Sequence, residues 1–354
     1  MGFMDYSYIP ILGVRPAEMK ALEELAPYAK DAILPYVVLQ PWLSAKELAS
    51  TVARVNAAAG ARPVIVDITE PLPIGGKRRS VHDAFDLLRT PANGFERFVE
   101  FVTENENFIP SVQLTDLSQL NHQVQRLGAL GRGAAVRLHE PMLPYAGDIA
   151  ARFAGIISGT NLHFILDFEK QNKEILVKAA VSLQAITQIR NALPDCSVSV
   201  SASTFPETFV GLDYQDIFER QFHAVVNDAV QSENVIYCDR GSARAEALGG
   251  GGGPPAPRID MANLSRWNFF RVDDADDKVE GFRRAANSAM DAGCWNDLGI
   301  WGTEYIKRTA GDDEIDIIDT AAKCTAARIN IHLHMQATNG GAQGEAALET
   351  GWTD

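Results

Sequence analysis

The sequence lacks the features that mark several classes of protein. Its four cysteines are widely spaced and form no C-x-x-C pair, so it predicts neither a disulfide framework nor a zinc site built from cysteines. No apolar run approaches the roughly 20 residues that a membrane-spanning helix needs. The first residues, MGFMDYSYIPIL, contain no basic leader followed by an apolar stretch. We therefore expect no signal peptide, no membrane span and a cytoplasmic location.

An excess of positive charge is also missing. The chain has 32 Lys and Arg against 46 Asp and Glu, which gives a formal net charge of −14. An acidic surface repels polyanions at long range, so general binding to nucleic acid or to anionic membranes is disfavoured. The run Lys77-Arg78-Arg79 is the strongest basic cluster, and a solvated loop is its simplest interpretation.

Short apolar or β-branched segments recur along the chain, separated by segments with apolar residues at helical spacing. The eight segments cover residues 8–14, 33–41, 63–69, 109–115, 134–139, 163–168, 197–203 and 235–240. Alternating strands and helices predict a parallel sheet covered by helices. Eight such units favour a closed (β/α)8 TIM-like barrel, an α/β fold. An open doubly wound parallel sheet is the alternative, although no G-x-G-x-x-G motif follows any strand.

The pattern changes after the eighth strand. We expect a barrel domain over residues 1–310 that contains a glycine-rich loop at 246–258, where five glycines follow one another. A C-terminal segment, 311–338, is expected to pack on the barrel. Residues 339–354 are rich in Gly, Ala and Thr and predict a disordered tail.

Polar residues stand at the C-terminal ends of nearly all the predicted strands. In barrel enzymes these ends form the ligand-binding mouth. The residues are Arg15, Gln40, Asp67, Gln113, Arg137, His139, Asp167, Glu169, Ser201, Ser203, Asp239 and Arg240. Four of the charged ones interrupt apolar runs: Asp67, Arg137, Asp167 and Asp239. A buried charge costs several kcal/mol unless it is paired, so these positions predict a ligand site, with a structural ion network as the alternative.

The chemistry of this site stays open at the level of sequence. Three carboxylates, Asp67, Asp167 and Asp239, could hold a divalent cation, act as general acid and base, or anchor Arg137. His139 is a candidate proton carrier. The arginines could bind a phosphate or a carboxylate. No G-x-S-x-G motif is present, so the serines of residues 197–203 are expected to supply hydrogen bonds rather than a nucleophile.

Two histidines near the end of the chain form a weak metal signal. His332 and His334 would face the same side of a strand and could bind a metal there, whereas on a helix they would diverge.

Several segments resemble the phage-type Beta proteins, a family of T-even phage beta protein-like sequences. The matching blocks are YIPILGVRPAEMKALEEL, ILPYVVLQPW, DRGSA at 239–243, RWNFFR, GTEYI at 302–306 and RINIHLHM. The resemblance implies a barrel-like unit in a phage, prophage or defence-associated context, and it brings no established reaction. The positions it highlights are Arg15, Asp239, Arg240, Ser242, Trp267, Arg271, Asn330 and His332. The polyglycine insertion and the separated His332-Leu-His334 pair depart from the family pattern.

Three functions are compatible with these patterns. The first is an enzyme, such as a hydrolase or lyase, that acts on a small phosphorylated or nucleotide-like molecule at the barrel mouth. The second is a non-catalytic sensor that uses the same pocket. The third is an interaction component with a phage or host protein as partner. Charges inside a barrel mouth favour the first two over the third, and fold alone does not separate those two.

Overall fold

A ring of parallel strands forms the centre of the protein. The computed structural model describes residues 2–71, 77–230, 235–244, 255–311 and 315–338. The strand order in its main sheet is β4-β3-β2-β1-β9-β7-β6-β5, and every pair of neighbours is parallel. These strands are β1 (Tyr8–Gly13), β2 (Tyr36–Leu39), β3 (Val64–Ile68), β4 (Phe108–Pro110), β5 (Ala134–His139), β6 (Leu162–Lys170), β7 (Ser197–Ser203) and β9 (Val235–Asp239).

The ring closes between β4 and β5 through a narrow seam. An isolated parallel bridge joins Ser111 to Ala135, and the amide of Val112 donates to the carbonyl of Ala135 over 2.8 Å. Arg132 supports the seam from below, because its Nη1 donates to the carbonyls of Val102, Asn105 and Phe108 at 2.7–3.1 Å. The eight strands expected from the sequence therefore form a (β/α)8-like barrel, and the open-sheet alternative is wrong.

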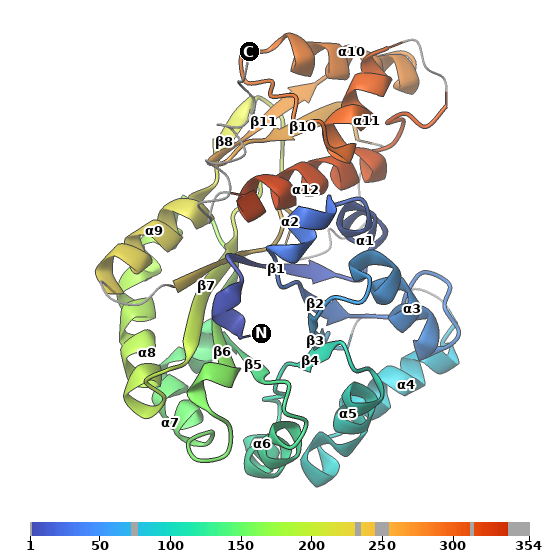
Figure 1. Ribbon diagram of the computed structural model, residues 1–354. Coiled ribbons are helices and arrows are strands. Elements are labelled where there is room, and N and C mark those ends of the chain that lie inside the picture. The colour runs from blue at the N-terminus through green and yellow to red at the C-terminus, as the bar shows by residue number, and fades with distance from the viewer. Residues whose placement is uncertain (1, 72–76, 231–234, 245–254, 312–314, 339–354) are drawn as a thin grey trace, which may run out of the picture.

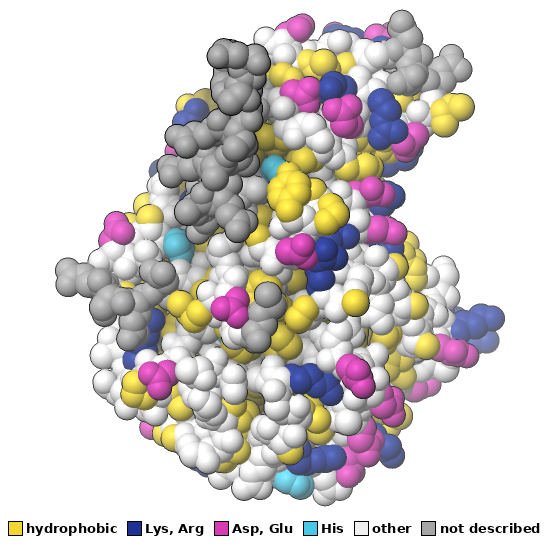
Figure 2. Space-filling model, viewed as in Figure 1, with side chains coloured by type: hydrophobic (Ala, Val, Ile, Leu, Met, Phe, Trp, Pro, Cys, Tyr) yellow, Lys and Arg dark blue, Asp and Glu magenta, His cyan; other side chains and the backbone are white. Residues whose placement is uncertain are grey.

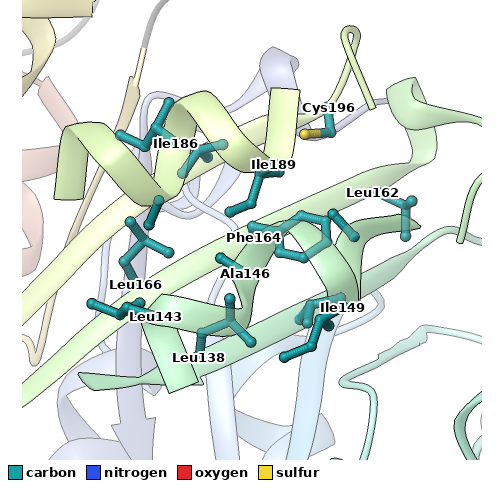
Figure 3. Packing of buried hydrophobic residues seen from close by; sticks show 14 of the residues in the cluster. Leu138, Leu143, Ala146, Ile149, Leu162, Phe164, Leu166, Ile186, Ile189 and Cys196 are labelled. Carbon is teal, nitrogen blue, oxygen red and sulfur yellow. The ribbon is translucent and has the colours of Figure 1, made fainter. Parts of the chain in front are cut away.

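Helices cover the outside of the ring (Figure 1). They are α1 (Pro16–Glu23), α2 (Pro27–Asp31), α3 (Leu48–Ala59), α4 (Ser80–Leu88), α5 (Ala92–Glu104), α6 (Leu120–Gly128), α7 (Ala146–Ala151), α8 (Ala179–Ala192) and α9 (Phe218–Val230). Figure 3 shows one part of this outer layer, where Ile186 and Ile189 of α8 face Phe164 and Leu166 of β6. Burial of such side chains contributes about 1.5–3 kcal/mol each and fixes the outward face of each strand.

The residues between these outward positions face the barrel interior. The lower part of the interior is apolar and includes Ile9, Ile65, Ala135 and Ile165. At the N-terminal end of the strands, the ring of Phe3 stacks on His163 with centroids 5.3 Å apart. The N-terminal segment thus lies across the centre of the ring, as Figure 1 shows. The opposite, C-terminal end holds the charged residues.

A second, smaller unit is built mainly from the chain after β9, with one strand supplied by the connection between β7 and α9. Its antiparallel sheet has the order β10-β11-β8, from β8 (Tyr214–Asp216), β10 (Arg258–Ala262) and β11 (Arg266–Arg271). Helices α10 (Lys278–Asp291) and α11 (Trp301–Ala310) pack with it around a separate apolar cluster that contains Trp267, Phe269 and Phe282. We call this unit the C-terminal lobe.

Helix α12 (Ala321–Thr338) returns from the C-terminal lobe to the barrel. Its Ile329 and Leu333 join Tyr8, Leu12 and Tyr237 in the cluster on the outer face of β1 and β9. It therefore takes the place of the helix that follows the eighth strand, with the lobe inserted between strand and helix. None of the described helices is both long enough and apolar enough to span a membrane. The polyglycine run and the C-terminal tail lie outside the described residues.

Candidate functional site at the barrel mouth

Alternating charges form a continuous chain of ion pairs inside the mouth. Arg137 of β5 places Nη2 2.8 Å from Asp67 Oδ2 on β3, and its Nη1 lies 3.6 Å from Asp167 Oδ2 on β6. Arg240, which follows β9, reaches the same Asp167 oxygen over 2.5 Å. Residues from β3, β5 and β6 and the residue after β9 thus meet at the C-terminal ends of the strands, where the sequence predicted a cluster of polar groups. The order around the mouth is Asp67, Arg137, Asp167 and Arg240.

Asp67 is held by several donors besides Arg137. Its Oδ2 accepts a hydrogen bond from the hydroxyl of Tyr36 at 2.7 Å, and its Oδ1 accepts from Gln113 Nε2 at 2.9 Å and from the amide of Ile68 at 2.8 Å. Tyr36 also contacts Ser111 Oγ at 2.7 Å, next to the seam. Both oxygens of this carboxylate therefore already accept hydrogen bonds from the protein.

Asp167 is fully buried and remains ionised. Burial opposes its charge, but Arg240 and then Arg137 hold the pKa of this carboxyl below its usual value. Burial likewise disfavours the charge of Arg137, yet Tyr36, Asp67 and Asp167 together hold its pKa above the ordinary value. Both arginines keep 12% of their side-chain surface exposed, so the chain of charges borders solvent.

The rim of the mouth carries more accessible groups. His139 Nδ1 lies 3.4 Å from Glu169 Oε1, with 36% and 59% of the two side chains exposed. Glu169 has φ of 54°, and the β6–β7 register shifts beside it. A non-glycine residue held in this left-handed region is strained, and such strain is found most often at functional sites. Arg15 also lies at the rim, where its Nη1 is 3.3 Å from Glu18 Oε1.

The serines predicted as ligand contacts lie deeper. Ser201 is buried on the inward face of β7, and its hydroxyl has no hydrogen-bond partner within the described residues. Ser203 donates to the carbonyl of Ala243 over 2.8 Å. Ser242 is buried with φ of 59°, and its Oγ has no hydrogen-bond partner within the described part of the chain.

Asp239 faces away from the barrel interior, which corrects our expectation of three inward carboxylates. Its strand neighbour Cys238 faces inward, and Asp239 projects to the outer side, toward α12. Its Oδ2 lies 2.7 Å from His332 Nε2. Burial opposes its charge, but His332 and the hydrogen bonds from Tyr8 and Tyr237 lower the pKa of Asp239 to about 2. Asp239 is therefore not part of the mouth.

The site residues predicted from the last part of the chain lie in two separate regions of the structure. Trp267 of β11 stacks on His332, with centroids 6.1 Å apart. Arg271 lies at the other end of β11, where it pairs with Asp273 at the surface. His332 and His334 lie on a helix, and His334 contacts Tyr28 instead of the partner of His332. Across the described residues, no group of three or more His, Cys, Asp or Glu is placed to hold a metal ion.

Several basic residues elsewhere are paired with acidic ones. Arg78 of the basic run contacts Asp83 and Asp86 at the surface. Figure 2 shows basic side chains next to acidic ones over the face viewed there. A cleft of about 540 Å³ lies between α1, α11 and α12 and includes Trp301. Its cations are neutralised by acidic neighbours, through the ion pairs Lys20–Glu24, Arg308–Asp316 and Lys323–Asp319.

Sequence reasoning missed Tyr36, Ser111 and Glu18. Tyr36 stands on the inward face of β2 in the segment ILPYVVLQ, and counting alternate residues back from Gln40 would have found it. Glu18 is buried at the start of α1, where its carboxylate accepts from the amide of Gly13. It follows Arg15 in an ordinary helical sequence that gives no sign of its burial.

Comparison with known proteins identifies the family. The family model described as "Beta protein" matches residues 8–338. This chain belongs to the Beta protein family. It is 30% identical over 350 residues to "Protein beta" of Enterobacteria phage P4, and the match covers 94% of each chain. No solved structure matches. The matched region contains the barrel, the C-terminal lobe and α12, so the lobe belongs to the family's shared sequence.

Proposed function

We propose that the barrel mouth binds a small anionic molecule of the phosphorylated or nucleotide-like class. The observation that carries this proposal is the pair of arginines on either side of Asp167. Within the described residues, the Nε atoms of Arg137 and Arg240 are buried and have no hydrogen-bond acceptor. A buried donor without a partner costs about 1–3 kcal/mol. Phosphate oxygens would satisfy these donors and bring charge-assisted hydrogen bonds.

The surroundings support the same ligand class. Asp67 and Asp167 balance the charges of Arg137 and Arg240, and Arg15, which is paired with Glu18, adds another guanidinium at the rim with 35% of its side chain exposed. Ser242 Oγ offers a further unused hydroxyl beside Arg240 in the sequence. Because neither inward aspartate is arranged as a proton donor, binding is the role that the mouth supports most directly.

Catalysis by a hydrolase or lyase is the second candidate. Its support is the His139–Glu169 pair, which stands at the rim with a strained backbone. An imidazole at the rim can move a proton to or from a bound ligand, although within the described residues His139 Nδ1 makes no hydrogen bond to Glu169. The relative from phage P4 supports a phage or prophage context for this protein. A non-catalytic sensor, or a component with a phage or host protein partner, would use the barrel without this proton transfer.

The test is a panel of anions against purified protein at low salt. Inorganic phosphate, pyrophosphate and nucleoside monophosphates are titrated by calorimetry, and thermal unfolding is followed in parallel. At about 100 times Kd a ligand stabilises its protein by about 2.7 kcal/mol. Arg240→Gln should abolish the response, whereas Arg97→Gln, an exposed arginine on α5, should retain it.

Two outcomes decide between the proposals. If no anion of the panel binds, or if Arg240→Gln binds as the wild type does, the proposed site is wrong. His139→Gln should leave anion binding intact in either case. If one bound anion is also converted, loss of its conversion in this variant supports catalysis.

A further inference from the structure

Two adjacent residues at the end of β9 point to opposite sides of the barrel wall. Arg240 reaches inward to Asp167, while Asp239 projects outward to α12. The backbone that follows them forms an unusual turn, since Gly241 and Ser242 both have φ of 59°. A Cβ atom at Gly241 would lie 2.8 Å from Leu12 Cδ2, so the turn packs closely on β1.

Asp239 sets this turn through four hydrogen bonds. Its Oδ1 accepts from the hydroxyl of Tyr8 at 2.5 Å and from the amide of Gly241 at 2.7 Å. Its Oδ2 accepts from the hydroxyl of Tyr237 at 2.7 Å and lies 2.7 Å from His332 Nε2. The bond to Gly241 ties the carboxylate to the turn that aims Arg240. A rotation of the Asp239 side chain would therefore move the backbone that positions the Arg240 side chain in the mouth.

His332 is the donor that comes from outside the strands. It is completely buried on α12, and Trp267 of the C-terminal lobe stacks on its ring with an angle of 28° between the planes. The same helix is fixed two residues earlier, where Asn330 donates to the carbonyl of Ala21 in α1 and accepts from the amide of Gly302 in α11. The lobe and α12 together determine where His332 Nε2 lies.

We infer that His332 is a positioning residue for Arg240: through Asp239, it links α12 and the C-terminal lobe to the anion-binding mouth. The inference rests on the proposed function and adds to it a second part of the chain on which anion binding depends. A contact in the outer wall of the barrel thus controls a guanidinium in its interior. Hydrogen bonds to a charged group contribute more to stability than those between neutral groups. Loss of the bond from His332 Nε2 would therefore loosen the position of the Asp239 carboxylate.

The experiment compares two substitutions of His332 with a control on the same helix. His332→Leu removes the donor, His332→Gln keeps an amide N–H that can reach Asp239, and His334→Leu alters a neighbouring histidine that contacts Tyr28. Phosphate affinity is measured by calorimetry at a temperature at which all variants are folded. We expect about tenfold weaker binding in His332→Leu, which corresponds to about 1.4 kcal/mol, and near wild-type affinity in the other two.

A second measurement separates this inference from the proposed function. The Nε–H resonance of Arg240, assigned by its loss in Arg240→Gln, reports on the guanidinium without any ligand. This resonance should shift in His332→Leu and in Asp239→Asn, and it should stay in place in His334→Leu. Asp239→Asn replaces His332→Leu in the comparison if the leucine variant does not fold. If the wild type binds no phosphate but this resonance shifts, the proposed function fails while the coupling stands. If the resonance and the phosphate affinity of the His332 and Asp239 variants match the wild type, His332 is merely structural.

Discussion

Replacing Asp167 by Asn tests whether the chain of charges in the mouth is a coupled unit. The Asp167 side chain is completely buried and contacts Arg240 at 2.5 Å, the amide of Glu169 at 3.0 Å and Arg137 at 3.6 Å. Breaking a buried ion pair by removing one partner costs about 3–5 kcal/mol. Arg137 keeps its contact with Asp67, and both arginines border solvent. We therefore expect a loss near the lower limit, about 3 kcal/mol of unfolding free energy.

The assay is urea unfolding at pH 7, followed by circular dichroism. The double variant Asp167→Asn/Arg240→Gln completes a thermodynamic cycle, because it removes the unpaired charge that the single substitution leaves. We expect the double variant to lose less than the sum of the two single losses, with a coupling energy of about 1–3 kcal/mol. Asp148→Asn, at an exposed position on α7, should change the free energy by no more than about 0.5 kcal/mol.

Two results would refute this reasoning. A loss below about 1 kcal/mol in Asp167→Asn would mean that the pair behaves like a surface ion pair. Additive losses in the double variant would mean that Asp167 and Arg240 do not interact in solution. Either result would also weaken the anion site, because that site depends on arginines held in place by Asp167.

Two further predictions concern buried groups with shifted pKa values. Burial raises the pKa of Glu219 from 4.5 to about 7, so its contribution to stability is full below pH 4.5 and is lost as the pH rises through 7. Glu219→Gln should therefore raise the unfolding free energy at pH 8 by up to about 3 kcal/mol and change it much less at pH 5; equal effects at both pH values would contradict this. Burial lowers the pKa of His163 from 6.5 to about 3, so its contribution is full above pH 6.5 and is lost as the pH falls toward 3. His163→Gln should flatten the dependence of stability on pH in that interval, as measured by urea unfolding at several pH values.

The alternation of side chains made much of the barrel predictable. Every strand segment expected from the sequence is present, and the inward positions of Asp67, Arg137 and Asp167 follow from a period of two within apolar runs. Convergence of these residues is then a consequence of closure, because the C-terminal ends of parallel strands share one rim.

The same rule shows where the prediction went wrong. Asp239 and Arg240 are adjacent, so a strand cannot turn both side chains inward, and the apolar run before them does not reveal which one faces the mouth. The helix α12 that receives Asp239 is separated from β9 by the C-terminal lobe. The pairing of β8 with β11 joins Asp216 to Arg266, a contact between distant segments that local sequence patterns do not encode. Local sequence patterns also left open whether the segment that contains His332 forms a strand or a helix.

Neighbouring strands of the ring are not joined by equal numbers of backbone pairs. Neighbouring strands elsewhere share ladders of several residue pairs, whereas β4 and β5 meet through one bridge that Arg132 supports. Ser111, at that bridge, shares the Tyr36 hydroxyl with Asp67. The wall therefore has few backbone hydrogen bonds across the seam near Asp67, whereas near Arg240 helix α12 packs against it. Arg137 of β5 stands at the sparsely joined side and Arg240 at the side that α12 covers, so the two arginines of the mouth are held by different parts of the wall.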